Sequence, residues 1–354
     1  MIDTTDRLVS HLQASRQGCA APVCAIDTEA DSLHRYRESL CLIQFADRND
    51  PVLIDPLAIG DLSAFGAYLA AATVWMHGAD YDMTMFKRQF GALPPVVYDT
   101  QIGARLLGVR RFGLGDLVSL YFGVDLSKSS QKADWGKRPL SPKMIEYALN
   151  DVRYLLEMGD IIVAGLKSQG RYAWFEESCA AARQRVLDRD DSKEENWRIQ
   201  GSGKLERFGL VCLRALWYWR DAEAKVWDRP SFMVTTNRQL LEWSHDLANR
   251  KNISLPHHFR PARVKRFQAA VAAVEALAEK DWPQRVAHKR RKPDRDFERK
   301  VDALIKTREQ AAAKLDIESS LIAPRSALES IVTGDAMPAD VLLAWQRECL
   351  GLND

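Results

Sequence analysis

Short apolar runs separated by polar turns dominate the first hundred residues of the chain. Runs of this length, bounded by turn-forming residues, are typical of β-strands in a protein interior. We therefore predict strands at 23–27, 40–46, 51–55, 73–77 and 96–98. The polar residues at 47–50 predict a turn between the second and third strands.

Helical patterns lie between and after these strands. Helices are predicted at about 61–71 and 80–90. Another is predicted to begin at Ser141-Pro142, because serine caps a first turn and proline fits the first helical position. The alternation of strands and helices predicts an α/β domain over residues 1–170.

The rest of the chain is predicted to be helical and is divided by charged segments. We predict a helical and charged linker at 171–196, a helical domain at 197–280, and a basic linker with a second helical segment at 281–354. In the first helical domain, Trp217 and Trp219 each follow a leucine by three or four positions. This spacing predicts core packing rather than stacking on bases.

Composition limits the classes to which the protein can belong. With 354 residues, 46% of them hydrophobic, the chain can bury two or three domain cores. Its apolar segments fall short of the ~20 residues of a membrane span, and its start lacks a secretory signal pattern, so we expect no membrane partner. Six scattered cysteines without a Cys-x-x-Cys pair predict a reducing, cytoplasmic location and argue against a zinc site. The net charge of +2 does not by itself indicate nucleic acid.

Two short motifs each place two polar side chains on one face of their own element. Asp27 and Glu29 share a strand face, because residues i and i+2 point the same way, and the residue between them points opposite. Tyr147 and Asp151 share a helix face at i, i+4. Together with Asp82, four carboxylates could converge on one spot, where divalent cations would have to neutralise their repulsion. Oxygen ligands of this kind suit magnesium or manganese.

In this order and spacing, the five residues resemble the motifs of the DEDD superfamily of 3′→5′ exonucleases, in the subclass with tyrosine in the last motif. The match is closest to the ribonuclease D family and extends to flanking segments at 39–45, 52–56, 98–101 and 134–140. The resemblance implies an α/β ribonuclease H-like domain, with a mixed sheet flanked by helices, followed by all-α HRDC-like domains. It places one HRDC-like domain at 197–280 and a more divergent one within 281–354.

The resemblance also implies an activity and a role for each motif residue. The family is that of metal-dependent exoribonucleases, which use two Mg²⁺ or Mn²⁺ ions and release nucleoside 5′-monophosphates. By analogy, Asp27 would bridge both ions, and Glu29 and Asp151 would hold the ion beside the nucleophile. Asp82 would act on the other ion, and Tyr147 would orient the attacking water. The implied substrate is RNA with a single-stranded 3′ end, such as tRNA precursors and other small structured RNAs.

Several basic residues are candidates for holding such a substrate. Lys128, Lys132 and Arg138 precede the motif formed by Tyr147 and Asp151 and could contact the phosphates of the scissile strand. His77, at the end of a predicted strand, is another candidate, and the basic run at 288–292 is a further one. The chain contains no Gly-x-x-x-x-Gly-Lys-Ser/Thr loop, so no nucleotide cofactor is expected.

Two other functions fit parts of this pattern. A 3′→5′ DNA exonuclease would use the same metals, because only contacts to a 2′-hydroxyl distinguish the two sugars. The HRDC-like segment and the lack of polymerase or helicase motifs favour RNA. A catalytically silent RNA-binding protein is the other alternative, and the presence of all five motif residues argues against it.

Overall fold

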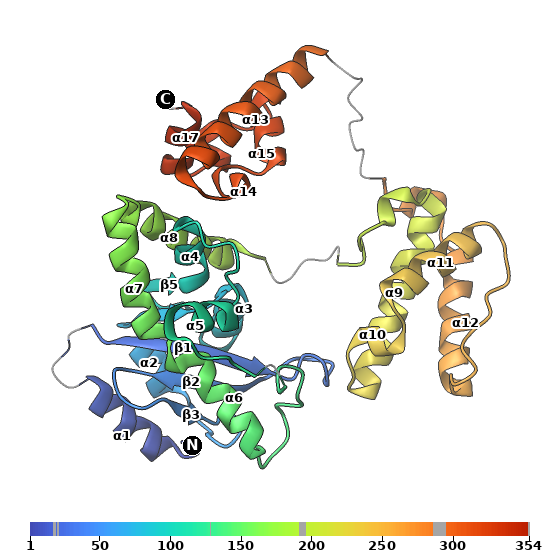
Figure 1. Ribbon diagram of the computed structural model, residues 1–354. Helices are drawn as coiled ribbons and strands as arrows, with labels where there is room; N and C mark the ends of the chain where they lie inside the picture. Colours follow the sequence, from blue (N-terminus) through green and yellow to red (C-terminus); the bar gives the residue numbers. More distant parts are fainter. Residues whose placement is uncertain (17–18, 20, 128, 191–195, 286–294, 353–354) are drawn as a thin grey trace. The chain divides into compact units, whose positions relative to one another are not determined.

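The chain folds into two compact units. The computed structural model describes residues 1–16, 19, 21–127, 129–190, 196–285 and 295–352 (Figure 1). One unit, here called the sheet unit, consists of Met1–Ala30, Leu40–Arg189 and Arg291–Asp354. The other, here called the helical unit, consists of Asp31–Ser39 and Asp190–Arg290. The expected α/β fold followed by a largely helical region is confirmed.

A five-stranded mixed sheet is the frame of the sheet unit. Its strand order is β3-β2-β1-β4-β5, with bounds Val52–Ile54, Leu40–Ala46, Val23–Ala30, Thr73–Met76 and Val96–Asp99. Strand β1 runs antiparallel to β2 and parallel to β4. The five predicted strands are confirmed, but β1 continues past its predicted end to Ala30 because β2 pairs with it along that length. Asp27 and Glu29 therefore lie inside a central strand.

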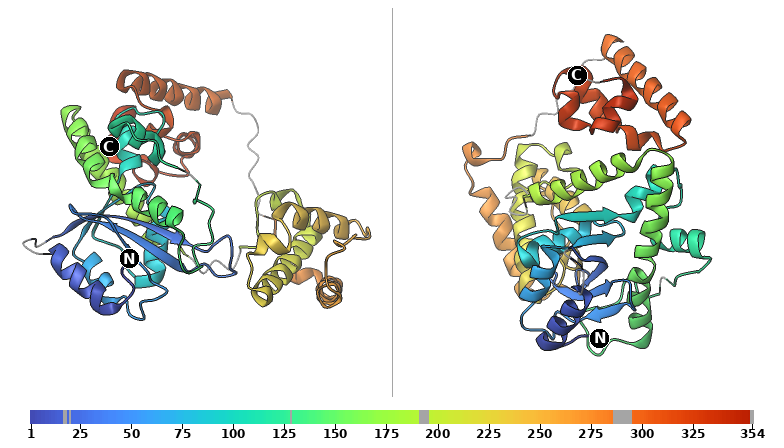
Figure 2. Two further views of the ribbon diagram at one scale, coloured as in Figure 1. Left: turned by 60° about the horizontal axis from the view of Figure 1, so that its bottom comes forward. Right: turned by 90° about the vertical axis from the view of Figure 1, so that its left-hand side faces the viewer.

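Helices cover both faces of this sheet (Figure 2). One face packs against α1 Thr5–Arg16, α2 Ser63–Leu69 and α3 Asp80–Phe90. The other packs against α4 Thr100–Leu106, α5 Leu114–Phe122, α6 Pro142–Arg153 and α7 Leu155–Ser168, while α8 Tyr172–Asp188 lies along β5. Successive side chains of a strand point to opposite faces of the sheet, which explains this division. Cys24 and Ile26 pack in the layer with α1, α2 and α3, whereas Ala25 packs in the layer on the other face.

The C-terminal segment packs within the sheet unit. Its helices are α13 Arg295–Leu315, α14 Ser319–Ile322, α15 Arg325–Thr333, α16 Pro338–Val341 and α17 Ala344–Leu350. Trp345 stacks on Trp174 of α8, with ring centroids 5.0 Å apart. The Arg171 guanidinium donates to the carbonyl oxygens of Leu106 and Leu315, both at 2.7 Å. The segment predicted as a second helical domain thus shares an apolar core with α4, α5, α7 and α8.

The helical unit is built around a long central helix. Its helices are α9 Arg207–Trp227, α10 Ser231–Val234, α11 Asn237–Ala248 and α12 Pro261–Glu275. Trp219 of α9 contacts Trp243 and Phe267 edge-on, which confirms the predicted core role of Trp219. The buried Glu223 accepts hydrogen bonds from two arginines of α12 and so ties that helix to α9. This unit therefore has its own apolar core.

One segment of the helical unit comes from the N-terminal part of the chain. Residues 31–39, between β1 and β2, pack on the end of α9. The Tyr36 hydroxyl donates to Asp221 at 2.8 Å, and Arg35 pairs with Asp228 at 3.1 Å. The chain therefore leaves the sheet unit directly after Ala30, contacts the helical unit, and returns at Leu40.

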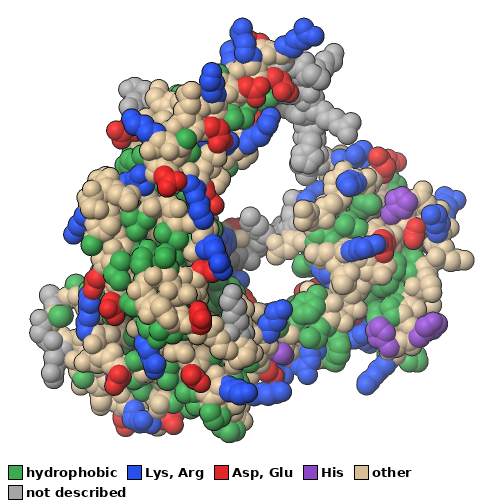
Figure 3. Space-filling model, in the orientation of Figure 1, with side chains coloured by type: hydrophobic (Ala, Val, Ile, Leu, Met, Phe, Trp, Pro, Cys, Tyr) green, Lys and Arg blue, Asp and Glu red, His purple; other side chains and the backbone are tan. Residues whose placement is uncertain are grey.

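Positive and negative side chains are interspersed over the face of the molecule that Figure 3 shows. This distribution agrees with a net charge of only +2. Among the helices of the described residues, none combines the length and the apolar character of a membrane span.

Candidate active site

Strand β1 presents two carboxylates on one face of the sheet. Asp27 lies beside Gln44 of β2, and Glu29 lies beside Leu42. Both acids are partly exposed, whereas Thr28 between them is buried and faces the opposite layer. Pairing with β2 therefore holds both acids in place, and pairing with β4 holds the part of β1 that precedes them.

Helix α6 brings Tyr147 and Asp151 to the same face. Ser141 caps the helix by accepting the backbone N–H of Met144 at 3.3 Å, and proline occupies the first turn as predicted. The helix packs over β1 and β2. Carboxylate oxygens of Asp27, Glu29 and Asp151 lie within 4.8 Å of one another. These three acids form the group that we call the acidic cluster.

Asp82 approaches from the other face of the sheet. It lies in the first turn of α3 and is buried, and the Thr28 hydroxyl donates to its Oδ1 at 2.5 Å. Four carboxylates at one spot were expected: three form the acidic cluster, and the charge of Asp82 acts on all three, contributing to the raised pKa values of Asp27, Glu29 and Asp151. Asp82 reaches the site from α3, which belongs to the layer toward which Thr28 points.

The pKa values of these four acids are raised, which means that burial and mutual repulsion disfavour their charged forms. Burial, and then the neighbouring carboxylates, raise the pKa of Asp27 well above its ordinary value and that of Glu29 to about 9. Burial is also the largest cause that raises the pKa of Asp82 and of Asp151 to about 7, although hydrogen bonds from Thr28 and Tyr147 oppose it. Buried carboxylates that repel each other gain most from a bound cation. The donor set, all oxygen, fits Mg²⁺ or Mn²⁺.

Tyr147 lies half-buried at the edge of the acidic cluster. Its ring packs near Trp135, with centroids 6.0 Å apart, and its hydroxyl hydrogen-bonds Asp151. Burial, and then the charges of Asp151, Glu29 and Asp27, raise the pKa of Tyr147. The hydroxyl therefore stays protonated at neutral pH and can donate a hydrogen bond, but it cannot serve as a free base.

The turn before α3 is held by Asp99. Its carboxylate accepts the backbone N–H groups of Gly78 and Ala79, at 2.9 and 3.0 Å, and caps α4 through Gln101 at 2.8 Å. His77 in the same turn contacts the Thr100 hydroxyl through Nδ1 at 2.9 Å, and burial lowers its pKa. Asp99 thus positions the start of the helix that bears Asp82.

The structure gives Arg138 a different role from the one expected. All five of its N–H donors are engaged, two with the buried Asp55 at 2.5 and 2.7 Å and the others with carbonyl oxygens of Cys41, Trp135 and Lys137. A phosphate would have to displace one of these bonds. Arg138 therefore fixes the segment before α6 to β2 and to the residue that directly follows β3, and we do not assign it to RNA.

Replacing Arg138 with Met should destabilise the protein by about 3–5 kcal/mol, because the Asp55 charge would stay buried without its partner. Burial raises the pKa of Asp55, but hydrogen bonds and charge from Arg138 outweigh it, so the net pKa is lowered. A lowered pKa gives stability above the ordinary value of ~3.9 that is lost as the pH falls. Urea unfolding from pH 7 to 3 should show the difference from wild type shrinking with acidity.

The matched control for this change is Lys137→Met, since Lys137 is exposed and pairs loosely with Asp134 at 3.6 Å. Its effect on unfolding should stay within ~0.5 kcal/mol. Equal destabilisation by the two variants would refute the structural role of Arg138.

The other basic candidates for contacts to RNA are Lys132, Lys128 and the run at 288–292. Lys132 is exposed, and no ion pair is found for it within the described parts of the chain. Lys128 and the run at 288–292 lie outside the described residues.

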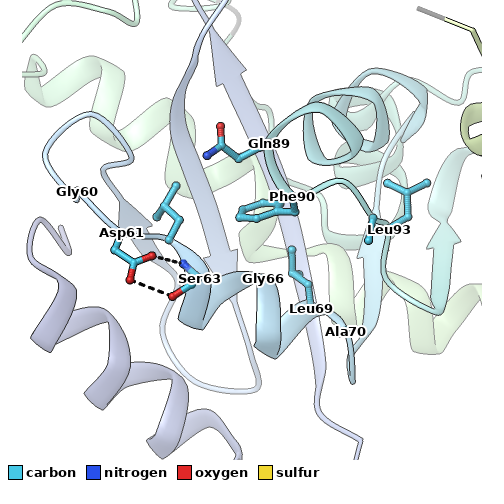
Figure 4. A pocket seen from close by; sticks show the side chains of 11 residues that line it. Gly60, Asp61, Ser63, Gly66, Leu69, Ala70, Gln89, Phe90 and Leu93 are labelled. Atoms are coloured by element: carbon cyan, nitrogen blue, oxygen red, sulfur yellow. Dashed lines mark hydrogen bonds between the residues drawn. The ribbon is translucent and has the colours of Figure 1, made fainter.

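A cavity of about 520 Å³ lies beside α2 and the end of α3 (Figure 4). It is lined by residues of α2, the end of α3 and the turns next to them, including Leu69, Phe90 and Leu93. Asp61 at its rim bonds the backbone and the hydroxyl of Ser63, at 2.8 and 3.0 Å. The motif residues do not line it, so this cavity is separate from the candidate site.

Sequence comparisons agree with this geometry. Residues 2–167 match a family model described as a 3′-5′ exonuclease. Ribonuclease D of Xanthomonas oryzae pv. oryzae is 30% identical over 357 residues, which cover 97% of this chain and 94% of the relative. Ribonuclease D of Escherichia coli is 34% identical over 250 residues, 69% of this chain and 64% of that protein.

Comparisons with solved structures extend the likeness to the fold. The crystal structure of Escherichia coli RNase D, described as an exoribonuclease involved in structured RNA processing, matches with a TM-score of 0.76 at 29% identity. The match covers 94% of this chain and 90% of the other. A protein from Bifidobacterium adolescentis, 22% identical, has the same fold, with a TM-score of 0.81 over 99% and 94% of the two chains.

Proposed function

Since the chain belongs to the ribonuclease D family of 3′→5′ exoribonucleases, we propose that its acidic cluster and Asp82 hold two divalent cations for phosphodiester hydrolysis. The observation that supports this most strongly is the group of three carboxylates with oxygens within 4.8 Å of one another. When bound, Mg²⁺ or Mn²⁺ would supply a nucleophilic hydroxide and would stabilise the leaving 3′ oxygen.

Each motif residue has a separate role in this proposal. Asp27 is central, because its charge interacts with Glu29, Asp82 and Asp151 alike, and we propose that it contacts both ions. Glu29 and Asp151 complete the side where water attacks, and Asp82 serves the leaving-group side. The protonated hydroxyl of Tyr147 orients the attacking water. Nucleoside 5′-monophosphates are the expected products.

The proposed substrate is RNA with a single-stranded 3′ end, such as tRNA precursors. The name of the Escherichia coli structure, which mentions structured RNA processing, supports this choice. His77 and Lys132 remain proposed RNA contacts beside the site, and the helical unit would hold the body of the RNA. A cytoplasmic location is proposed because all six cysteines are free.

The function is tested by a time course on matched 3′-tailed RNA and DNA oligonucleotides, each labelled at the 5′ end. Wild type and Asp27→Ala are incubated with Mg²⁺, Mn²⁺ or EDTA. A ladder that shortens from the 3′ end of RNA, requires metal and is absent in the variant is the expected result. Equal or faster ladders on DNA would favour a DNA exonuclease. Binding of RNA without any ladder would favour a silent binding protein.

A further inference from the structure

The side-chain amide of Gln44 lies inside the sheet unit without a hydrogen-bond partner. Gln44 is 0% exposed, and neither Oε1 nor Nε2 is bonded to any of the described residues. An amide can donate two hydrogen bonds and accept two, and buried polar groups in proteins are nearly always bonded. This amide therefore has unused bonding capacity.

Strand pairing places Gln44 next to the acidic cluster. On β2 it lies directly opposite Asp27 of β1 on one side and opposite Leu53 of β3 on the other. Side chains of such antiparallel pairs share a face, with Cβ atoms about 4.5–5.5 Å apart. The three residues form a row under α6, which packs over all three strands.

Few side chains around Gln44 in this row can form a hydrogen bond with its amide. Leu53 is apolar, and the neighbours of Gln44 on the same strand face are Leu42 and Ala46. Asp27 is therefore the polar side chain of its row. Full burial excludes direct contact of Gln44 with RNA, so any effect on catalysis must act through another residue.

We infer that Gln44 is a positioning residue for Asp27. Its amide N–H donates to the Asp27 carboxylate, directly or through one bound water, when that carboxylate turns to hold cations. The carboxylate oxygen that accepts this bond keeps a lone pair for the metal. The inference rests on the proposed metal site and assigns to Gln44 the outer-shell role by which proteins orient metal ligands.

The test is the thermal stabilisation that Mg²⁺ gives to the full chain without RNA. Gln44→Met keeps the size of the side chain but removes its donors. The Mg²⁺ concentration for half of the Tm increase should rise about 10–100-fold. Without metal, the Tm should equal or exceed that of wild type, because an unbonded buried amide is replaced by an apolar group. Mn²⁺ should show the same ranking.

Leu53→Met is the matched control, because it introduces the same side chain into the same row without changing a polar group. Its Mg²⁺ response should be that of wild type. A wild-type Mg²⁺ response in Gln44→Met would overturn the inference, and so would an equal loss in Leu53→Met, which would point to packing. If Gln44→Met does not fold, Gln44→Leu replaces it in the same comparison. No Mg²⁺ response in the wild type itself would instead reject the proposed metal site.

Discussion

Asp151→Asn should lose nearly all exonuclease activity while the protein stays folded. Asp151 contributes one of the three oxygens in the acidic cluster, and a neutral amide cannot replace the charge of a carboxylate beside a cation. Metal ions supply several kcal/mol of transition-state stabilisation, so the rate of 3′ trimming should fall about 10³-fold or more. In EDTA the variant should melt no lower than wild type, because one of several repelling charges is gone. Single-turnover trimming and thermal melting measure the two effects.

Glu146→Gln is the control for this change. Glu146 is exposed on the same helix, and its replacement removes the same unit of charge. It should keep the wild-type rate. Full activity in Asp151→Asn would refute the assignment of the site, and a rate loss shared by Glu146→Gln would indicate a general charge effect.

Tyr147→Phe should slow turnover by about 10²-fold or more while leaving metal binding in place. The substitution removes the hydroxyl that bonds Asp151 but keeps the ring that packs near Trp135. The stabilisation of the protein by Mg²⁺ should therefore persist, since no carboxylate is lost. We expect the effect in kcat rather than in KM, because the hydroxyl acts on the water and not on the RNA. Steady-state kinetics with a short 3′-tailed RNA measure both constants.

Tyr154→Phe is the matched control. It also removes a tyrosine hydroxyl, at the residue between α6 and α7. Tyr154 packs on Phe122, with ring centroids 5.2 Å apart, in a different apolar cluster from that of Tyr147. It should keep the wild-type kcat. A wild-type kcat in Tyr147→Phe would exclude the proposed orientation of water, and loss of the Mg²⁺ response would instead make Tyr147 part of the metal site.

Local patterns predicted the elements that bear the site. The apolar runs match all five strands, and the Ser-Pro signal matches the start of α6. Spacing within one element also placed Asp27 with Glu29, because strand alternation is a local property of the backbone. The same holds for Tyr147 and Asp151, whose helical spacing brings the hydroxyl and the carboxylate together.

Features that depend on tertiary packing were not predicted. The hydrogen bond from Thr28 to Asp82 was not predicted, because which face of the sheet α3 covers is decided by the layers and not by the sequence of α3. Arg138 lies in a basic segment, and only the folded chain shows that Asp55 and three carbonyl groups use all its donors. Gln44 was part of a family-like apolar segment, and its position beside Asp27 follows from the strand register. Cross-strand neighbours of this kind have no signal in a single sequence.

The path of residues 31–39 has a consequence for anyone who shortens this protein. A fragment that ends at Arg189 keeps these residues but loses Asp221 and Asp228, the partners of Tyr36 and Arg35. The severed contacts lie in the connection from β1, which bears Asp27, to β2, five and six residues after the end of β1. Weak activity in such a fragment would therefore combine the loss of the proposed RNA contacts with a less firmly held catalytic strand and with the loss of α13–α17 from the core of the sheet unit. Point substitutions in the intact chain separate these effects, whereas truncation cannot.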